Sequence, residues 1–213
     1  MTSLALRLSV YDIASGPAPL AIPAGGTRFA FATPAALQIS RAHQQTRLAA
    51  DDGCFIEGAF EVTGAGWLFE CAAAEQPLLS NAAAQIVLSQ RIEVDFAGPY
   101  LLRADRVASD PGAETPMHGH RGPGIRRLLT GRILATIGDT TERLETGRAW
   151  LETGRDWVVG RNVHAGENIF IRVMLLPAEL QGGLSSFVPA SPEEATRPRS
   201  VSYRIFGEQK FHP

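Results

Sequence analysis

The sequence has little of several residue types that would direct its function. Lys210 is its single lysine, so arginines supply nearly all of its 20 basic side chains against 22 acidic ones. The resulting net charge of −2 gives nucleic acid and anionic lipid no electrostatic attraction, so we expect neither as a partner. The two cysteines, Cys54 and Cys71, have no CxxC spacing and predict buried core residues rather than a disulfide or a zinc pair.

Long apolar runs are also missing. No stretch approaches the roughly 18 uninterrupted apolar residues of a membrane span. The N-terminus lacks a basic region followed by an apolar run, so we expect no signal peptide and a cytoplasmic protein. The composition is 45% hydrophobic and 20% charged, which excludes disorder, and 213 residues fit one large domain or two small ones.

Turn-forming residues are abundant, with 21 glycines and 14 prolines spread along the chain. They separate short segments rich in aromatic or β-branched residues, and no helical stretch of 10–15 residues intervenes. This pattern predicts an all-β sandwich or barrel. The expected strands include Thr27–Ala32, Cys54–Glu57, Trp67–Glu70, Gln85–Leu88, Ile169–Leu176 and Val201–Phe206.

Two pairs of segments indicate an internal repeat. Phe31–Ile39 aligns with Leu128–Thr136, and Leu48–Gly58 aligns with Leu144–Gly154 at nearly the same offset. We therefore expect two similar β modules joined near Ile92–Gly98, with domains over residues 1–95 and 96–213. The alternative is one larger sandwich whose hairpins only look alike.

A histidine pair is the main candidate for chemistry. His118 and His120 are two residues apart, so on a strand both imidazoles point to the same face. Such a pair can share a divalent transition metal, although metal sites usually have at least three protein ligands. The alternative is a solvated or core histidine pair without a metal.

The residues around this pair resemble the first motif of the cupin superfamily. Glycines and histidines stand at the motif's spacing at Gly112, His118, His120, Gly124 and Gly131. Gly147, Asn162 and Phe170–Pro177 are similar to its second motif and the strand after it. The first half is similar to a degenerate module without paired histidines, over Ile22–Gly26 and Leu48–Gly58. The resemblance implies a bicupin, two double-stranded β-helix (jelly-roll) barrels in tandem.

The sequence departs from the family's metal ligands. The metal-binding glutamate of the motif falls on Gly124, and the second-motif histidine falls on Val158 or Trp157. Only His118 and His120 remain of four family ligands. We expect Glu152, an acid on the strand before the second-motif turn, to be the best replacement ligand. Asp156 and His164 are weaker candidates, and each of the three can instead be a surface residue.

Strand parity places a positive charge beside the histidines. If His118 and His120 face the barrel interior, Arg126 faces it too, and a buried guanidinium requires an anion. We expect a ligand that carries a carboxylate or phosphate. The alternatives are a structural ion pair between Arg126 and Glu152, or a bulge that turns Arg126 outward. Trp150, Trp157 and Met117 are candidates for an apolar lid, or for packing.

Two functions follow from the resemblance. The first is binding of a small acidic molecule in the C-terminal barrel against a metal on His118, His120 and Glu152. Iron, manganese, nickel or copper would suit dioxygenase chemistry, and zinc would suit isomerisation or hydrolysis. The alternative is a non-catalytic binding or sensing protein without a functional metal, and a purely structural oligomer is a third reading. Pairing of exposed strand edges predicts a homodimer.

Overall fold

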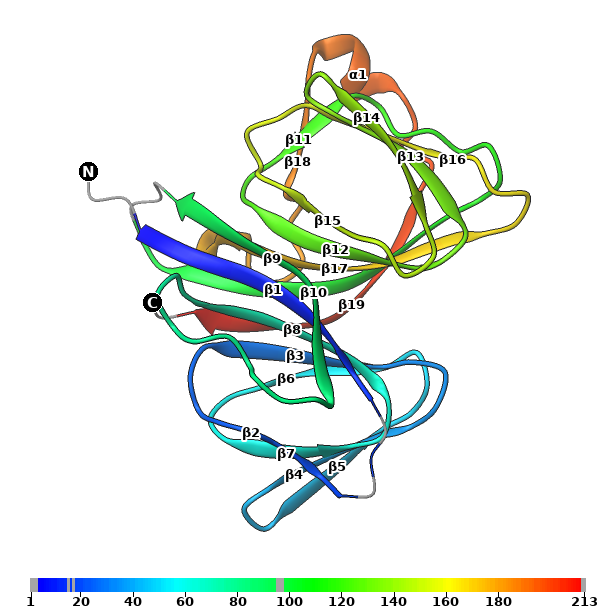
Figure 1. The fold of residues 1–213 in the computed structure, drawn as a ribbon. Coiled ribbons are helices and arrows are strands. Elements are labelled where there is room, and N and C mark those ends of the chain that lie inside the picture. The colour runs from blue at the N-terminus through cyan, green and yellow to red at the C-terminus, as the bar shows by residue number, and fades with distance from the viewer. Residues whose placement is uncertain (1–3, 15, 17, 95–97, 212–213) are drawn as a thin grey trace. The chain divides into compact units, whose positions relative to one another are not determined.

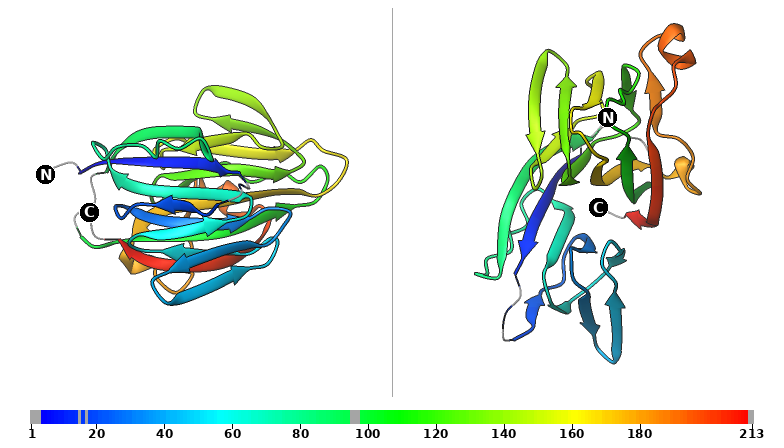
Figure 2. Two further views of the ribbon diagram at one scale, coloured as in Figure 1. Left: turned by 60° about the horizontal axis from the view of Figure 1, so that its bottom comes forward. Right: turned by 90° about the vertical axis from the view of Figure 1, so that its right-hand side faces the viewer.

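The chain forms two compact units of β structure, residues 1–97 and 98–212. The structure, a computed structural model, describes residues 4–14, 16, 18–94 and 98–211. In each unit two antiparallel sheets face each other and enclose an interior (Figures 1 and 2). The predicted boundary between residues 95 and 96 lies outside the described residues. Within the described ranges, no helix is long and apolar enough to cross a membrane.

The first unit combines a five-stranded and a four-stranded sheet. The larger sheet has the order β6-β3-β8-β1-β9 and the smaller one β2-β7-β4-β5. The strands of the larger sheet are β1 (Leu4–Ile13), β3 (Thr27–Ala32), β6 (Gly53–Ile56), β8 (Gly66–Ala73) and β9 (Ala84–Val94). Those of the smaller sheet are β2 (Leu20–Ile22), β4 (Leu37–Arg41), β5 (Gln44–Leu48) and β7 (Phe60–Thr63). The four segments predicted as strands here overlap β3, β6, β8 and β9.

Apolar side chains fill the interior of the first unit. Alternate residues of the facing strands, such as Ala30 and Ala32 on β3, meet in one cluster, as the two-residue period of a strand requires. Arg28 and Glu70 form a buried ion pair on the same sheet, with 2.7 Å between Nη2 and Oε1. Apolar side chains from its two sheets therefore form the core of the first barrel.

The second unit has two five-stranded sheets. One has the order β15-β12-β17-β10-β19 and the other β14-β13-β16-β11-β18. The strands of the first are β10 (Tyr100–Ser109), β12 (Gly124–Thr130), β15 (Ala149–Glu152), β17 (Asn168–Pro177) and β19 (Ser202–Phe211). Those of the second are β11 (His118–His120), β13 (Arg132–Ile137), β14 (Thr140–Glu145), β16 (Val158–Asn162) and β18 (Phe187–Pro189).

The two units repeat one strand order, which confirms the prediction of two similar modules. The strands of the sheet β6-β3-β8-β1-β9 in the first unit correspond, one to one and in this spatial order, to those of β15-β12-β17-β10-β19 in the second. Arg28 pairs in register with Glu70 in the first unit, and Arg126 pairs with Arg172 at the corresponding position of the second. The alternative of one large sandwich is wrong, because each module closes its own pair of sheets.

A C-terminal segment (residues 178–205) crosses the second unit after β17. It begins with a 3-10 turn at Ala178–Leu180, adds β18 beside β11, and ends on β19 beside β10. Between β18 and β19 lies a short helix, α1 (Pro192–Thr196), that the sequence analysis did not predict. Ser191 caps it by accepting a hydrogen bond from the backbone N–H of Glu194, with Pro192 in the first turn.

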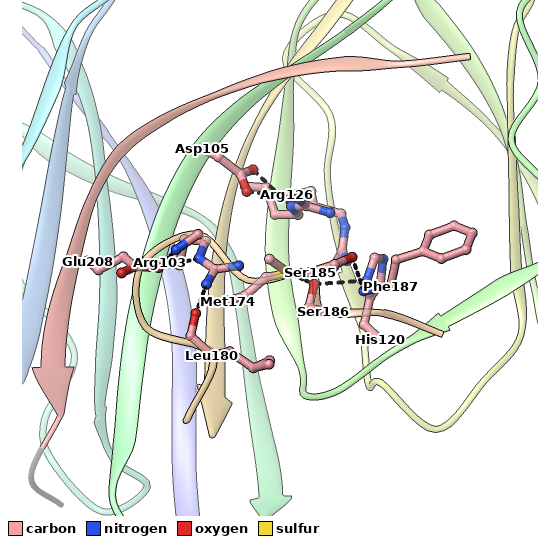
Figure 3. A network of polar contacts seen from close by, with 12 residues as sticks. Arg103, Asp105, His120, Arg126, Met174, Leu180, Ser185, Ser186, Phe187 and Glu208 are labelled. Atoms are coloured by element: carbon pink, nitrogen blue, oxygen red, sulfur yellow. Dashed lines mark hydrogen bonds and ion pairs between the residues drawn. The ribbon is translucent and has the colours of Figure 1, made fainter. Parts of the chain in front are cut away.

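Arg103 holds this segment against the barrel. Its Nε lies 2.7 Å from Oε1 of Glu208 on β19, and its guanidinium donates to the carbonyls of Leu180 and Leu184 (Figure 3). Glu208 in turn accepts hydrogen bonds from the backbone N–H groups of Gly182 and Gly183. The start of the C-terminal segment is thus fixed by a buried, charge-assisted network.

Candidate functional site

The interior of the second unit contains a cavity of about 110 Å³. Both sheets and the C-terminal segment supply its walls. Its polar lining includes Arg103, Asp105, Thr115, His118, His120, Arg126, Glu152, Asn162, Arg172, Ser185, Ser186, Arg199 and Tyr203. Its apolar lining includes Val107, Ile133, Ala135, Trp150, Val158, Phe170, Phe187 and Ile205. This barrel therefore encloses space between polar side chains.

The predicted histidine pair lies side by side on the cavity wall. His118 and His120 are each 8% exposed, and their rings are perpendicular with centroids 4.9 Å apart. Nδ1 of His118 lies 2.8 Å from the carbonyl oxygen of Pro116, so it carries the proton and donates. Its Nε2 therefore carries the lone pair and can accept a hydrogen bond. Burial lowers the pKa of His118, against the smaller opposing effect of the Pro116 hydrogen bond.

His120 joins two other buried side chains. Its Nε2 lies 3.3 Å from Oε2 of Glu152, and its Nδ1 lies 3.5 Å from the hydroxyl of Ser186 (Figure 3). Burial lowers the pKa of His120 to about 4, although the hydrogen bond with Glu152 opposes the shift. The imidazole is therefore neutral at pH 7, with its proton on Nε2 toward the carboxylate and Nδ1 accepting from Ser186.

Glu152 is the centre of the polar network. In the β12–β15 register, Glu152 lies opposite Gly124 and Trp150 lies opposite Arg126. Oε2 lies 2.6 Å from Nη2 of Arg126, and Oε1 accepts a hydrogen bond of 3.0 Å from the indole N–H of Trp150. Burial disfavours the charged carboxylate, but Arg126 and the hydrogen bonds from His120 and Trp150 outweigh it. Together they hold the pKa of Glu152 well below its usual range.

Arg126 is one of the most deeply buried side chains in the described chain, with 1% exposed. Burial lowers the pKa of Arg126 to about 10, partly offset by Glu152, so the guanidinium stays charged at pH 7. Nη1 donates to the carbonyl of Gly124 over 2.7 Å. Arg126 points into the barrel, as strand parity predicts. Its anionic partner is Glu152 of the same chain.

Gly124 stands where the family motif has a glutamate. A Cβ at this position would lie 2.7 Å from Cγ of Met174, 3.1 Å from the carbonyl oxygen of Val173 and 3.3 Å from Nη1 of Arg126. The contact with Met174 is shorter than real Cβ atoms show and the other two are tight, so a side chain at this position would require its neighbours to shift. The space a glutamate would use is therefore filled by its neighbours.

An aromatic stack leads from the histidines to Arg199. Phe187 of β18 stacks on His118 with ring centroids 4.6 Å apart. The guanidinium of Arg199 lies over the other side of the stack, 4.3 Å from the Phe187 centroid. Its Nη1 donates to the hydroxyl of Ser185 over 3.3 Å. Arg199 is exposed, so it brings a positive charge to the edge of the cavity where solvent can reach it.

The structure separates the three residues expected to form an apolar lid. Trp150 lies in the wall at 6% exposure, and its ring meets Phe170 edge-on at 5.3 Å. Trp157 and Met117 are 47% and 41% exposed and do not line the cavity. A Cβ on Gly119 would lie 3.3 Å from the Trp157 ring, which places this ring on the outer side of β11, away from the histidines. Only Trp150 of the three therefore belongs to the site.

The two weaker candidate ligands also lie elsewhere. Asp156 accepts a hydrogen bond of 2.7 Å from the hydroxyl of Thr153 in an exposed turn, and His164 sits in a loop. Neither lines the cavity. Asn162, the asparagine of the second motif, orders that loop: its Nδ2 donates to three carbonyls at 3.0 Å, and its Oδ1 accepts from the His164 N–H.

Several cavity residues were missed by the sequence reading. Arg172 and Asp105 form a bidentate pair across β10 and β17, at 2.9 and 2.7 Å. Strand parity along the predicted strand Ile169–Leu176 could have found Arg172. Ser186, Arg199 and Tyr203 come from the C-terminal segment, and no local pattern marks them, because their approach to the histidines depends on long-range strand pairing.

The predicted metal ligands do not fit a metal ion as the structure places them. Within the described part of the chain, no three His, Cys, Asp or Glu side chains are placed to hold one metal. Glu152 is also already bound: the oxygen that faces His120 is 2.6 Å from the Arg126 guanidinium, and the other oxygen accepts from Trp150. A cation at Oε2 would lie against a buried like charge. In this arrangement the residues do not fit a metal.

Comparisons with known proteins identify the fold. No protein-family model and no curated protein sequence matches the chain. Among solved structures, AerE from Microcystis aeruginosa is similar with a TM-score of 0.59 and 12% identity, covering 80% of this chain and 88% of that one. Oxalate decarboxylase from Lactobacillus farciminis, as a formate complex, has a TM-score of 0.57 and 10% identity, covering 93% and 79%. A cupin 2 conserved barrel domain protein from Leptotrichia buccalis has a TM-score of 0.50 and 10% identity, covering 82% and 89%. Because likeness at such identities reports on architecture, what it shows is the fold of the cupin superfamily, present here as a bicupin with two barrels in tandem.

Proposed function

We propose that the C-terminal barrel binds a small organic acid, and that it does so without a metal ion. The distribution of charge around the cavity carries this proposal. Three arginines of the cavity have carboxylate partners: Arg103 with Glu208, Arg126 with Glu152 and Arg172 with Asp105. Arg199 at the cavity edge has no carboxylate partner among the described residues. A ligand carboxylate can accept two parallel hydrogen bonds from such a guanidinium.

The rest of the lining suits an apolar body of modest size. Val107, Ile133 and Phe170 form apolar wall, and Phe187 offers the edge of its ring beside Arg199. A cavity of about 110 Å³ limits the enclosed part of the ligand to a group about as large as one small ring. The ligand would place its carboxylate at Arg199 and its apolar part inside the barrel.

The histidine pair and its network would orient this ligand. His118 lines the cavity, and its Nε2 can accept a hydrogen bond because Nδ1 is bound to Pro116. His120 and Arg126 both lie within ion-pair distance of the same Glu152 oxygen, so the three side chains form one charge-balanced polar wall. Trp150 is fixed by its bond to Glu152 and would contact the ligand through its ring. Arg126 therefore acts on the ligand through Glu152 and not as its direct anion partner.

One comparison supports the ligand class. The oxalate decarboxylase of similar fold is named for a small dicarboxylate and was solved with formate. A barrel of this architecture can thus hold a small carboxylate. AerE and the Leptotrichia protein, which share the fold, are not named for a reaction.

Metal-dependent catalysis, of the dioxygenase or isomerase type, is the second candidate. The observation that favours it is the placement of both imidazoles on the cavity wall. It requires Glu152 to exchange the Arg126 guanidinium for an iron, manganese, nickel, copper or zinc ion.

Binding of benzoate and of its neutral isostere benzamide tests the proposal. Isothermal titration calorimetry is run on protein treated with EDTA. We expect benzoate to bind a few-fold more tightly than benzamide, since an ion pair with an exposed guanidinium contributes up to about 1 kcal/mol. Arg199→Gln should remove this preference, and Arg199→Lys should restore part of it.

Arg197→Gln is the matched control, because Arg197 lies in the same segment but pairs with Glu114 and Glu194 away from the cavity. This variant should bind benzoate as the wild type does. Equal binding of benzoate and benzamide would overturn the acid assignment. Benzoate binding that appears only after a metal is added, with metal content abolished by His118→Ala, would favour the metal-dependent enzyme.

A further inference from the structure

The Arg126 guanidinium stands among donor groups that would suit a metal. The same oxygen of Glu152 lies 2.6 Å from Nη2 of Arg126 and 3.3 Å from Nε2 of His120. The ring of His118 is perpendicular to that of His120, and its Nδ1 is bound to the Pro116 carbonyl, which leaves Nε2 as its ligating nitrogen. Two imidazoles and one carboxylate form a donor set for divalent transition metals. The cation beside them is supplied by the protein itself.

The absence of a side chain at position 124 is coupled to this arginine. Nη1 of Arg126 donates to the Gly124 carbonyl and would lie 3.3 Å from a Cβ on the same residue. A longer side chain, such as a glutamate, would have to occupy the volume that the guanidinium and Met174 now fill. A long side chain at position 124 and the Arg126 guanidinium in its present place would thus compete for the same space.

We propose that Arg126 is the resident cation of this barrel: its guanidinium neutralises Glu152 in the place of a divalent metal and blocks a site formed by His118, His120 and Glu152. The inference rests on the metal-free binding site proposed above and extends it. A guanidinium balances the buried carboxylate but has no open coordination position. The charge of Glu152 is thus balanced without a Lewis-acidic metal. A bound ligand would therefore contact fixed hydrogen-bonding groups instead of a metal ion.

Removing the guanidinium should therefore uncover a site for Co²⁺ or Zn²⁺. In Arg126→Met the side chain remains long and apolar while Glu152 loses its counterion. We expect stoichiometric Co²⁺ binding with the visible absorption of a low-symmetry cobalt site, and a rise in the thermal unfolding temperature when Zn²⁺ is added. The wild type, which retains Arg126, should show neither the absorption nor the rise.

The double variant Arg126→Met/Glu152→Gln is the matched control. It lacks the guanidinium as well but offers no carboxylate, so Co²⁺ binding should be lost. Arg126→Gln is a second test that retains a hydrogen-bonding group beside Glu152 and should bind Co²⁺ more weakly than Arg126→Met. If Arg126→Met is unfolded when purified without metal, recovery of its near-UV circular dichroism on adding Zn²⁺, but not Mg²⁺, is the expected result.

Two outcomes would overturn the inference. One is stoichiometric Co²⁺ binding by the wild type, because a resident guanidinium would then not block the site. The other is the finding that the Arg126→Met variant, folded as purified or after refolding, binds neither Co²⁺ nor Zn²⁺. In the second case benzoate binding by the wild type would remain intact, so failure of this inference is distinguishable from failure of the proposed function.

Discussion

Removing one partner of the Arg126–Glu152 pair should destabilise the C-terminal barrel far more than removing both. The two side chains are 1% and 7% exposed, with charged atoms 2.6 Å apart. Glu152→Gln keeps the size of the side chain but leaves a guanidinium buried without its counterion, at a cost of about 3–5 kcal/mol. Arg126→Met leaves the carboxylate unpaired and should cost a similar amount. The double variant removes both charges and should lie within about 1 kcal/mol of the wild type.

Urea unfolding followed by tryptophan fluorescence measures these differences. Trp67→Phe serves as the background, because Trp67 lies in the first unit and Trp150 and Trp157 lie in the second. Emission then reports on the barrel that carries the pair. Chelator is present throughout, so that a metal cannot replace the missing guanidinium.

The reasoning would be refuted by additive costs. A double variant as unstable as the two single variants combined would mean that each side chain acts through packing and not through the charge of its partner. Single variants within about 1 kcal/mol of the wild type would mean that water reaches the pair and screens it.

Three further changes have defined outcomes in the same unfolding assay. Gly124→Ala should cost about 1–3 kcal/mol, because its Cβ would lie 2.7 Å from Met174 Cγ; an unchanged midpoint would contradict the packing argument. His120 binds a proton in the unfolded chain near pH 6.5 but only near pH 4 when folded, so stability should fall by about 3 kcal/mol as pH drops between these values. His120→Asn should flatten that part of the pH profile, and an unchanged slope would count against a buried neutral imidazole. Asn162→Ala should cost about 3 kcal/mol because three carbonyls lose their donor; a loss below about 1 kcal/mol would show that water replaces it.

Strand parity accounts for most of what could be predicted about the site. Because side chains alternate along a strand, His118 and His120 define the inner face, and the same alternation on the next strand turns Arg126 inward. The internal repeat likewise predicted two modules from local spacing alone. The homodimer and the cytoplasmic location stay predictions.

The partners of these residues could not be read in the same way. Glu152 was considered both as a metal ligand and as a partner of Arg126, and the choice depends on the register between β12 and β15. That register brings together residues that are distant in the sequence, and one step of slippage would turn Glu152 outward. Arg199 is further removed, since its place beside Phe187 depends on how β18 and β19 add to two different sheets.

The C-terminal segment gives the cavity a wall that is synthesised after the rest of its lining. While this unit leaves the ribosome, β10 has no β19 beside it, and the barrel stays open on the side that Tyr203 and Ile205 later cover. The histidines, Arg126 and Glu152 are already in the nascent chain at that stage. The ligand proposed above could therefore be retained only once β19 has paired with β10.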